Sequence, residues 1–204
     1  MKQTALVLLT SFIVCLPVLT FSQKHWEIAK RQDGIVVYTK EEKTSEFKAF
    51  KGVVTVEAST NEIVSVLKDA NQYVEWYGYT RTSKLLKREA EIQYTYVETV
   101  FPWPYSNRDM VYRMSIEELE SGTVKVSLNG VPNYLPEKKE IVRMKEAKGY
   151  ILLRPIDANT EITYVFHSEP GNIPVWLANN SIAELPYKTL LGLRQLLHEG
   201  NFRE

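Results

Sequence analysis

The C-terminal part of the chain contains a helix that is apolar around most of its circumference. Beyond Pro186, its polar arc of Lys188, Gln195 and Glu199 is narrow, and its apolar positions are Tyr187, Leu190, Leu191, Leu193, Leu196 and Leu197. A helix of this kind must pack on an extensive apolar surface. Pro174 suits the first turn of the helical segment, whereas Pro186 should kink or interrupt it, because proline removes a hydrogen bond and clashes with the preceding turn.

The surface that this helix requires is predicted upstream, where one strand pattern follows another. Strand patterns, either apolar runs or alternating apolar and polar residues, occupy segments 35–38, 47–56, 80–88, 91–99, 108–118, 123–128, 141–147, 150–156 and 161–168. Turn signals at residues 121–122, 148–149 and 157–159 separate consecutive segments. Strands joined by tight turns form a largely antiparallel meander. We therefore predict one α+β domain, in which a curved antiparallel sheet of about eight or nine strands grips one long C-terminal helix.

Helical signals elsewhere are short. Ser59 and Glu62 fit a capping box, which predicts a helix that continues to Asp69. Residues 71–79 are dense in aromatic side chains and predict a short helix and a loop. Residues 26–31 predict a short helix or turn before the first strand.

Alternation along the strands indicates a candidate site around a loop with two prolines and a tryptophan, Phe101-Pro102-Trp103-Pro104. Side chains two residues apart lie on the same face of a strand. The residues predicted to face inward are Tyr94, Tyr96, Glu98, Met110, Tyr112, Met114, Tyr164 and Phe166. Such faces suit an apolar cavity, and they equally suit a filled core.

The N-terminus has the pattern of a secretory signal peptide. Lys2 precedes an apolar run, and small residues at Thr20 and Ser22 follow it. We predict cleavage after Ser22 and export to the periplasm or the exterior; an uncleaved membrane anchor is the alternative. Cys15, the only cysteine, lies inside this run after Val14 rather than after a small residue, so a lipid anchor is not expected. Residues 23–204 then contain no thiol.

The balanced charge and the absence of catalytic motifs argue against nucleic-acid binding and against several classes of enzyme. Residues 23–204 carry 24 basic and 25 acidic residues once Lys2 is removed, which gives no electrostatic footprint for nucleic acid. The three histidines are scattered, and no HExxH, GxSxG or glycine-rich phosphate loop is present. His167 and Glu169 have a spacing that a metal could use, but no third ligand is evident. We expect no cofactor and no metal.

The chain resembles the START lipid-transfer domains, which have a helix-grip fold. The resemblance runs from about Trp26 to Leu197, and its most specific part is the aromatic loop followed by residues 106–112, SNRDMVY, close to the phosphatidylcholine-transfer branch. Residues 167–174 (HSEPGNIP), Trp176-Leu177, Val142-Arg143, Trp76, Asp33-Gly34-Ile35 and Pro186 also match. The resemblance implies a curved sheet around a long apolar tunnel, with the C-terminal helix as its lid.

The polar groups inside such a tunnel would set its selectivity. Glu98 is the candidate acid, and Arg143 is one potential partner for it. Cholesterol-binding members of the family have an acid and an arginine in the tunnel, but Met114 stands at the matching arginine position here. Arg108 and Asp109 are expected to form a structural clamp at the strand entrance. Trp176 and Leu177 are expected in the lid, and Trp103 is either a loop anchor or a residue that contacts a membrane.

We therefore predict an exported, monomeric, non-catalytic domain that binds or transfers a lipid or another hydrophobic small molecule. Transient contact with a membrane is compatible with this function. One alternative is an enzyme that uses the same cavity, cyclase-like or hydrolase-like, with Glu98 as acid–base group. A second alternative is a protein-binding or structural module with a filled core, which would expose an apolar patch.

Overall fold

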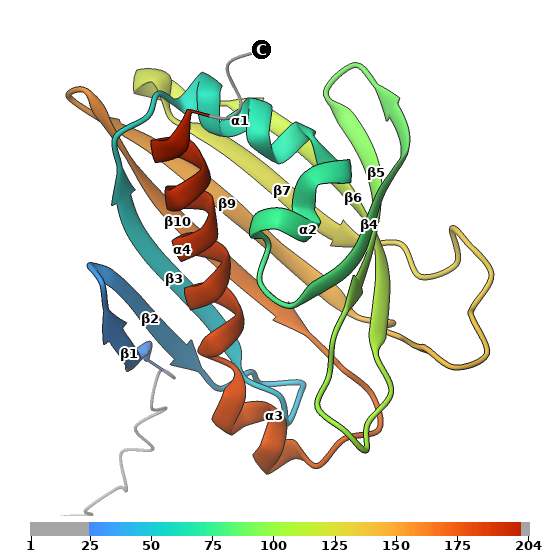
Figure 1. Cartoon of the computed structure of the whole chain (residues 1–204). Coiled ribbons are helices and arrows are strands. Elements are labelled where there is room, and N and C mark those ends of the chain that lie inside the picture. Colours follow the sequence, from blue (N-terminus) through green and yellow to red (C-terminus); the bar gives the residue numbers. More distant parts are fainter. Residues whose placement is uncertain (1–24, 201–204) are drawn as a thin grey trace, which may run out of the picture.

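A single ten-stranded sheet curves around one long helix (Figure 1). The computed structural model describes residues 25–200. The strands are β1 (Glu27–Gln32), β2 (Ile35–Lys40), β3 (Ala49–Val56), β4 (Thr80–Glu89), β5 (Ile92–Thr99), β6 (Arg108–Glu118), β7 (Val124–Gly130), β8 (Val142–Arg143), β9 (Ala147–Ile156) and β10 (Asn159–Ser168). The helices are α1 (Thr60–Lys68), α2 (Tyr73–Trp76), α3 (Val175–Ser181) and α4 (Glu184–Glu199), with short 3₁₀ turns at Ala70–Gln72 and Glu120–Gly122.

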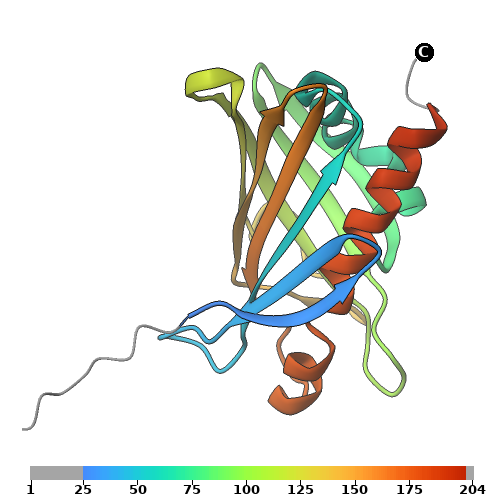
Figure 2. The same ribbon diagram turned by 90° about the vertical axis from the view of Figure 1, so that its left-hand side faces the viewer.

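The strand order explains how the sheet surrounds the helix. The order is β1-β2-β3-β10-β9-β7-β6-β5-β4, and β8 pairs with β6 outside this path. Every pairing is antiparallel except that of β8 with β6. Because β3 pairs with β10, the early strands and the late strands join in the middle of the sheet. Figure 2 shows α4 in the concave side of the curved sheet, which confirms the predicted α+β helix-grip architecture.

Glycines let α4 approach its neighbours closely. A Cβ at Gly192 would lie 2.4 Å from the backbone oxygen of Trp76, so this position of α4 tolerates no side chain. A Cβ at Gly52 of β3 would lie 2.7 Å from the Leu190 side chain. Leu190 and Leu193 are buried at 1% exposure each. The apolar face predicted for this helix is therefore packed on β3 and on the end of α2, as its composition requires.

The capping box of α1 is confirmed. The Ser59 hydroxyl accepts a hydrogen bond from the Glu62 backbone N–H at 3.2 Å, and the Glu62 carboxylate accepts from the Ser59 N–H at 2.8 Å. Ile63, Val66 and Leu67 bury the inner face of this helix. The predicted aromatic segment 71–79 contains the short helix α2, as expected.

Of two predictions near the ends of the described chain, the first was wrong and the second was confirmed. Residues 27–32 form strand β1 rather than a helix or turn, because Asp33 and Gly34 both have positive φ and close a two-residue hairpin with β2. The predicted interruption of the C-terminal helical segment is confirmed, since this segment is divided into α3 and α4 just before Pro186. The helix breaks at Ile182 and Ala183, and Pro186 lies in the first turn of α4, where its missing N–H costs little.

The predicted turn at residues 148–149 was also wrong. Gly149 lies inside the continuous strand β9 and is paired with Phe166 of β10. A Cβ at Gly149 would lie 2.5 Å from the Phe166 ring, so this glycine makes room for an aromatic side chain instead of turning the chain. The strand predicted at 141–147 is reduced to the two residues of β8 before β9 begins at Ala147.

Within residues 25–200, no helix is both long and apolar enough to cross a membrane. The predicted signal peptide, residues 1–22, and Cys15 lie outside the described residues.

Candidate ligand-binding cavity

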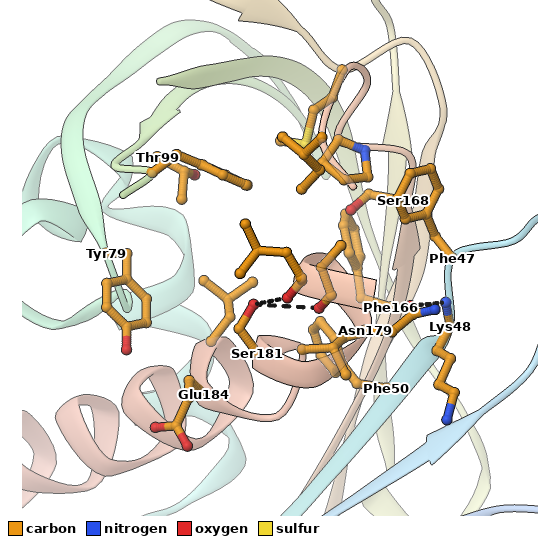
Figure 3. A pocket seen from close by; sticks show the side chains of 18 of the residues that line it. Phe47, Lys48, Phe50, Tyr79, Thr99, Phe166, Ser168, Asn179, Ser181 and Glu184 are labelled. Carbon is orange, nitrogen blue, oxygen red and sulfur yellow. Dashed lines mark hydrogen bonds between the residues drawn. The ribbon is translucent and has the colours of Figure 1, made fainter. Parts of the chain in front are cut away.

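A largely apolar cavity of about 480 Å³ lies at one end of the curved sheet, beneath α3 (Figure 3). Its walls come from the β2–β3 connection, the connection between α2 and β4, the end of β5 with the aromatic loop, and the segment from the end of β10 to the start of α4. Phe47, Phe50 and Phe166 lie across the cavity from Tyr79 and Thr99. The volume falls in the ordinary range of small-molecule sites, about 300–1,000 Å³.

The strand alternation shows where the cavity ends. On β6 Met110 lines the cavity, but Tyr112, the next residue on the same face, does not. The same change occurs on β10 between Phe166 and Tyr164, on β3 between Phe50 and Gly52, and on β5 between Thr99 and Val97. Deeper residues such as Ile35, Val54, Val126, Leu153 and Ile162 form a filled core with at most 2% exposure. The cavity therefore occupies the end of the curved sheet near α3, and deeper residues of the sheet are packed against side chains.

Four tyrosines lie where the cavity meets the packed core, and Tyr77 is the one of them that lines the cavity. The hydroxyls of Tyr77 and Tyr164 hydrogen-bond to each other, and the Tyr73 hydroxyl donates to the Leu67 carbonyl at 2.5 Å. Tyr73 and Tyr77 are stacked with ring centroids 5.5 Å apart. Burial raises the pKa of Tyr77 to about 12 and also raises the pKa values of Tyr73, Tyr112 and Tyr164. These hydroxyls are therefore neutral and able to donate hydrogen bonds at physiological pH.

One side chain fastens α3 over the cavity. Asn179 accepts a hydrogen bond from the Lys48 backbone N–H at 2.9 Å and donates to the Glu46 carbonyl at 3.0 Å. His167 makes a further hydrogen bond to the Phe47 carbonyl at 3.2 Å, so its ring supports the same loop. No residue of α3 is fully buried, whereas six residues of α4 are. The amide of Asn179 thus provides much of the directional bonding that holds this short helix to the sheet.

Charge is confined to the edge of the cavity. Lys48 and Glu184 are the charged residues among those that line it, and Glu184 forms an ion pair with Lys30 at 2.7 Å. The remaining walls are mainly aromatic and aliphatic. A hydrophobic molecule could enter without desolvating a fixed charge, whereas an ionised group at the floor would lack a counter-charge.

Arg108 serves as a structural clamp below the edge of the cavity. It is 1% exposed, and its guanidinium donates to the carbonyls of Pro170 at 2.8 Å and Asn172 at 3.3 Å, and also to that of Ser106. The same group lies 4.4 Å from the centre of the Phe101 ring. Burial lowers the pKa of Arg108. This side chain therefore ties the aromatic loop to the segment before α3, in agreement with the predicted clamp.

The face predicted for Tyr94, Tyr96 and Glu98 was wrong. Val97 belongs to the core, so its neighbours Tyr96 and Glu98 point to the outer side of the sheet. There, the residues between β7 and β8 cover them: Lys138 donates to the Tyr96 hydroxyl at 2.7 Å, and Tyr94 stacks on Tyr134 at 4.6 Å. When a loop covers the outer face of a strand, both faces of that strand contain apolar residues. The alternation in the sequence then cannot show which face points into the cavity.

Glu98 also has partners other than the predicted Arg143. It accepts a hydrogen bond from Asn107 at 2.8 Å and lies 3.6 Å from Arg81 and 3.9 Å from Lys138. Arg143 instead pairs with Asp109 on the outer side of the sheet. Neither Glu98 nor Arg143 lines the cavity.

The remaining predicted site residues fall into three groups. Met110, Phe166 and Leu177 line the cavity. Tyr112, Met114 and Tyr164 belong to the packed core at its floor or below. Trp103 and Trp176 are exposed, at 93% and 65%, in the loop and the helix that border the cavity.

Several lining residues were missed by sequence reasoning. The main ones are Phe47, Phe50, Tyr77, Phe101, Met144, Ile173 and Leu185. The alternation of β3 could have placed Phe50 on the inward face, since Phe50, Gly52, Val54 and Val56 are two residues apart. Tyr77 and Met144 lie in connections, where no periodicity indicates the direction of a side chain.

Comparison with known proteins gives a consistent result. A family model described as START domain matches residues 18–199. An uncharacterized protein of Pseudomonas aeruginosa is 36% identical over 171 residues, which cover 83% of this chain and 85% of that protein. Mouse phosphatidylcholine transfer protein is 26% identical over 163 residues, covering 76% of this chain and 75% of the relative.

A solved structure has the same fold. The crystal structure of a STAR-related lipid transfer protein from Xanthomonas axonopodis superimposes with a TM-score of 0.81 and 40% sequence identity, covering 85% of this chain and 98% of that one. The START family is known for the binding and transfer of lipids and other hydrophobic ligands. The match over nearly the whole described chain, together with the helix-grip fold and its apolar cavity, shows that this chain belongs to the START domain family.

Proposed function

We propose that this domain reversibly binds a lipid or another hydrophobic small molecule in the cavity beneath α3, without chemical change, and transfers it between surfaces. The observation that carries this proposal is a 480 Å³ cavity with apolar walls whose charged residues lie only at its edge. Burial of apolar surface stabilises such a complex by roughly 0.8 kcal/mol per CH₂ relative to water. Most of that gain cancels when the molecule comes from a bilayer, so exchange in both directions is feasible.

The C-terminal helical segment is proposed to close the cavity, with α3 as its movable part. Six buried residues and the close glycine contacts fix α4, whereas α3 is attached chiefly through Asn179. The break at Ile182 and Ala183 provides a hinge between the two helices. A ligand could then exchange when the Asn179 bonds open, while α4 stays in place.

Transient contact with a membrane is also proposed. The α3 helix and the aromatic loop lie at the same end of the molecule (Figure 1). Residues 170–183 and 99–107 contain no charged side chain, and each stretch exposes a tryptophan, Trp176 or Trp103. Tryptophan favours the interface between water and hydrocarbon, so these two stretches suit shallow insertion beside the edge of the cavity.

We further propose export through residues 1–22 and a monomeric state. The export proposal rests on the signal-peptide pattern alone. The monomer proposal is supported by the edge strand β4, which carries Arg81, Lys84, Lys87 and Arg88. Charged edge strands disfavour pairing with a second sheet.

The placement of Glu98 argues against the alternative in which this residue catalyses a reaction in the cavity. Its carboxylate lies on the outer side of the sheet with Asn107, Arg81 and Lys138. A general acid or base must reach the reacting group within hydrogen-bond distance. The Glu98 carboxylate has no such access to the cavity.

Native mass spectrometry tests the proposed binding. Residues 23–204 would be incubated with vesicles of a mixed lipid extract and then separated from them; we expect a bound molecule of lipid mass. Ala178→Trp, which fills the cavity from α3, should abolish the adduct. Asn180→Trp on the exposed side of the same helix is the matched control and should retain it. Absence of any adduct in the unsubstituted protein would contradict the proposal.

A further inference from the structure

The floor of the cavity contains hydroxyl groups that the packing of the chain does not require to be polar. Tyr77 lines the cavity and is 7% exposed, and Tyr164 lies directly behind it at 0% exposure. Their surroundings are otherwise aromatic, with the Phe50 ring 5.0 Å from that of Tyr164. Phenylalanine would fill much the same volume at either position without burying a polar atom. The two hydroxyls therefore need an explanation beyond packing.

Among the hydroxyl groups of these tyrosines, one O–H has no hydrogen-bond acceptor in the part of the protein that the structure describes. Tyr73 donates to the Leu67 carbonyl, and the Tyr73 oxygen in turn hydrogen-bonds with Tyr112, so the deeper pair is satisfied. In the pair Tyr77 and Tyr164, one hydroxyl donates to the other, and either can be the donor. The hydroxyl that accepts still has its own O–H, and this O–H has no acceptor among residues 25–200.

Of these two tyrosines, only Tyr77 is placed to donate its unpaired O–H to a molecule bound in the cavity. Tyr77 contributes to the wall of the cavity, whereas Tyr164 does not. When Tyr164 donates to the Tyr77 oxygen, the Tyr77 O–H is left without a protein acceptor among the described residues, and Tyr77 is the member of the pair that lines the cavity. A buried donor without a partner is unfavourable, and a ligand that supplies an acceptor there removes this penalty.

The charge distribution restricts the kind of acceptor. Tyr77 and apolar side chains such as Met110 and Phe166 line the inner part of the cavity, and the charged lining residues Lys48 and Glu184 belong to its edge. Because the pKa of Tyr77 is raised to about 12 by burial, the group stays a neutral donor at physiological pH. An anionic headgroup placed at this floor would find hydrogen bonds but no counter-charge.

We propose that the cavity selects molecules whose inserted end carries a neutral oxygen acceptor, a carbonyl, ester or hydroxyl oxygen, and that the Tyr77 hydroxyl binds this oxygen. This inference rests on the proposed function, because it names the chemical class of ligand for the same cavity. Since the tyrosine layer closes the inner end, the ligand enters with its oxygen leading and its apolar remainder toward α3. A compact neutral molecule fits this description; a phospholipid inserted headgroup first does not.

A matched pair of probes tests the inference. 2-Acetylnaphthalene carries a carbonyl, and 2-isopropenylnaphthalene has the same shape with a methylene in place of the carbonyl oxygen. Affinities for residues 23–204 would be measured by isothermal titration calorimetry. The unsubstituted protein should bind the ketone roughly fivefold or more tightly than the alkene, as one net hydrogen bond implies.

Two substitutions separate the role of Tyr77 from a general effect on the floor. Tyr77→Phe should bind both probes with equal affinity, since the donor that faces the cavity is gone. Tyr164→Phe should keep the preference for the ketone, because it leaves the Tyr77 hydroxyl with no other partner. Alkene binding by both variants shows that the cavity is still formed, so a folding defect is recognised.

The outcomes also distinguish this inference from the proposed function. If neither probe binds to the unsubstituted protein, and no lipid adduct forms either, the proposed function fails. If both probes bind with equal affinity to the unsubstituted protein, the cavity is a binding site and the inference is overturned; a water molecule would then satisfy the Tyr77 hydroxyl. Loss of the preference in Tyr164→Phe with its retention in Tyr77→Phe would also overturn it.

Discussion

Arg143 binds Asp109 through two hydrogen bonds of 2.7 and 3.1 Å, and both side chains are almost fully buried beneath the connection between β7 and β8. Arg143 also donates to the backbone carbonyls of Pro132 and Leu135 at 2.5 and 2.9 Å. The pKa of Arg143 is raised by its hydrogen bonds to Asp109. The pair therefore attaches a long connection to the outer side of the sheet.

We expect Arg143→Met to destabilise the protein by about 3–5 kcal/mol, because it leaves the buried Asp109 carboxylate without a partner. Urea denaturation followed by circular dichroism measures the change. The control is Arg154→Met, which breaks an exposed pair with Glu161 and should cost less than about 1 kcal/mol. Equal effects of the two substitutions would show that the buried pair has no special structural role.

Gly192→Ala should lower the free energy of unfolding by about 1–3 kcal/mol, the usual effect of overpacking, because it disturbs the contact between α4 and α2. The added Cβ would lie 2.4 Å from the Trp76 backbone oxygen, which cannot rotate away. Gln195→Ala on the exposed side of the same helix is the control and should change the stability by less than about 0.5 kcal/mol. Thermal unfolding of both variants provides the comparison. An unchanged stability of Gly192→Ala would contradict the close approach of α4 to the backbone of Trp76.

Asn179→Ala should accelerate ligand release by roughly fivefold to thirtyfold, because two hydrogen bonds of about 1 kcal/mol each hold α3 to residues 46–48. Stopped-flow fluorescence of a bound 2-acetylnaphthalene, displaced into empty vesicles, measures the rate. Asn180→Ala removes the neighbouring exposed amide and should release the ligand at the original rate. If the two variants release it equally fast, α3 is not the part that opens.

Trp103→Ala combined with Trp176→Ala should weaken binding to vesicles of zwitterionic phosphatidylcholine several-fold. Because both stretches around these residues lack charge, the binding should change little between low and high salt. Leu119→Ala, an exposed apolar residue at the far end of β6, is the control and should bind like the unsubstituted protein. Vesicle co-sedimentation tests this, and strong salt dependence would point to an electrostatic surface instead.

The tyrosine floor predicts a loss of stability at alkaline pH. Burial raises the pKa of Tyr77 to about 12 from the model-compound value of 10.0, so between these values the folded state holds a proton that the unfolded state has released. The stabilisation is thus fully present below pH 10 and is lost as the pH rises towards 12. Denaturant titrations from pH 8 to 11.5 measure this decline. In Tyr77→Phe the decline should be smaller, and an identical decline would show that other groups cause it.

Much of the fold could be predicted because its signals are local. The capping box at Ser59 and Glu62 and the hairpins within residues 80–118 depend on residues close in sequence. The apolar circumference of α4 also showed that a large surface must receive it. Where prediction failed, a distant contact overrode the local signal: Gly149 resembles a turn residue, but the ring of Phe166 requires its missing side chain.

The candidate site was predicted less well for the same reason. Met110, Phe166 and Leu177 were assigned correctly to the wall of the cavity by their alternation or motif. Tyr94, Tyr96 and Glu98 were assigned to the wrong side, because the sequence does not reveal that residues 131–141 fold back over the outer face. Once that face is covered, it is as apolar as the inner one, and alternation alone cannot distinguish them.

The sequence by itself determined the family, the order of the elements and the need for a sheet that encloses one apolar helix, since these depend on periodicity and on motifs of neighbouring residues. Only the tertiary structure decided how deep the cavity is and which groups close it. The floor joins Tyr77 to Tyr164, and Asn179 fastens α3 to Glu46 and Lys48, over large separations along the chain. Such pairings follow from the packing of the whole sheet around α4, and no local pattern encodes them.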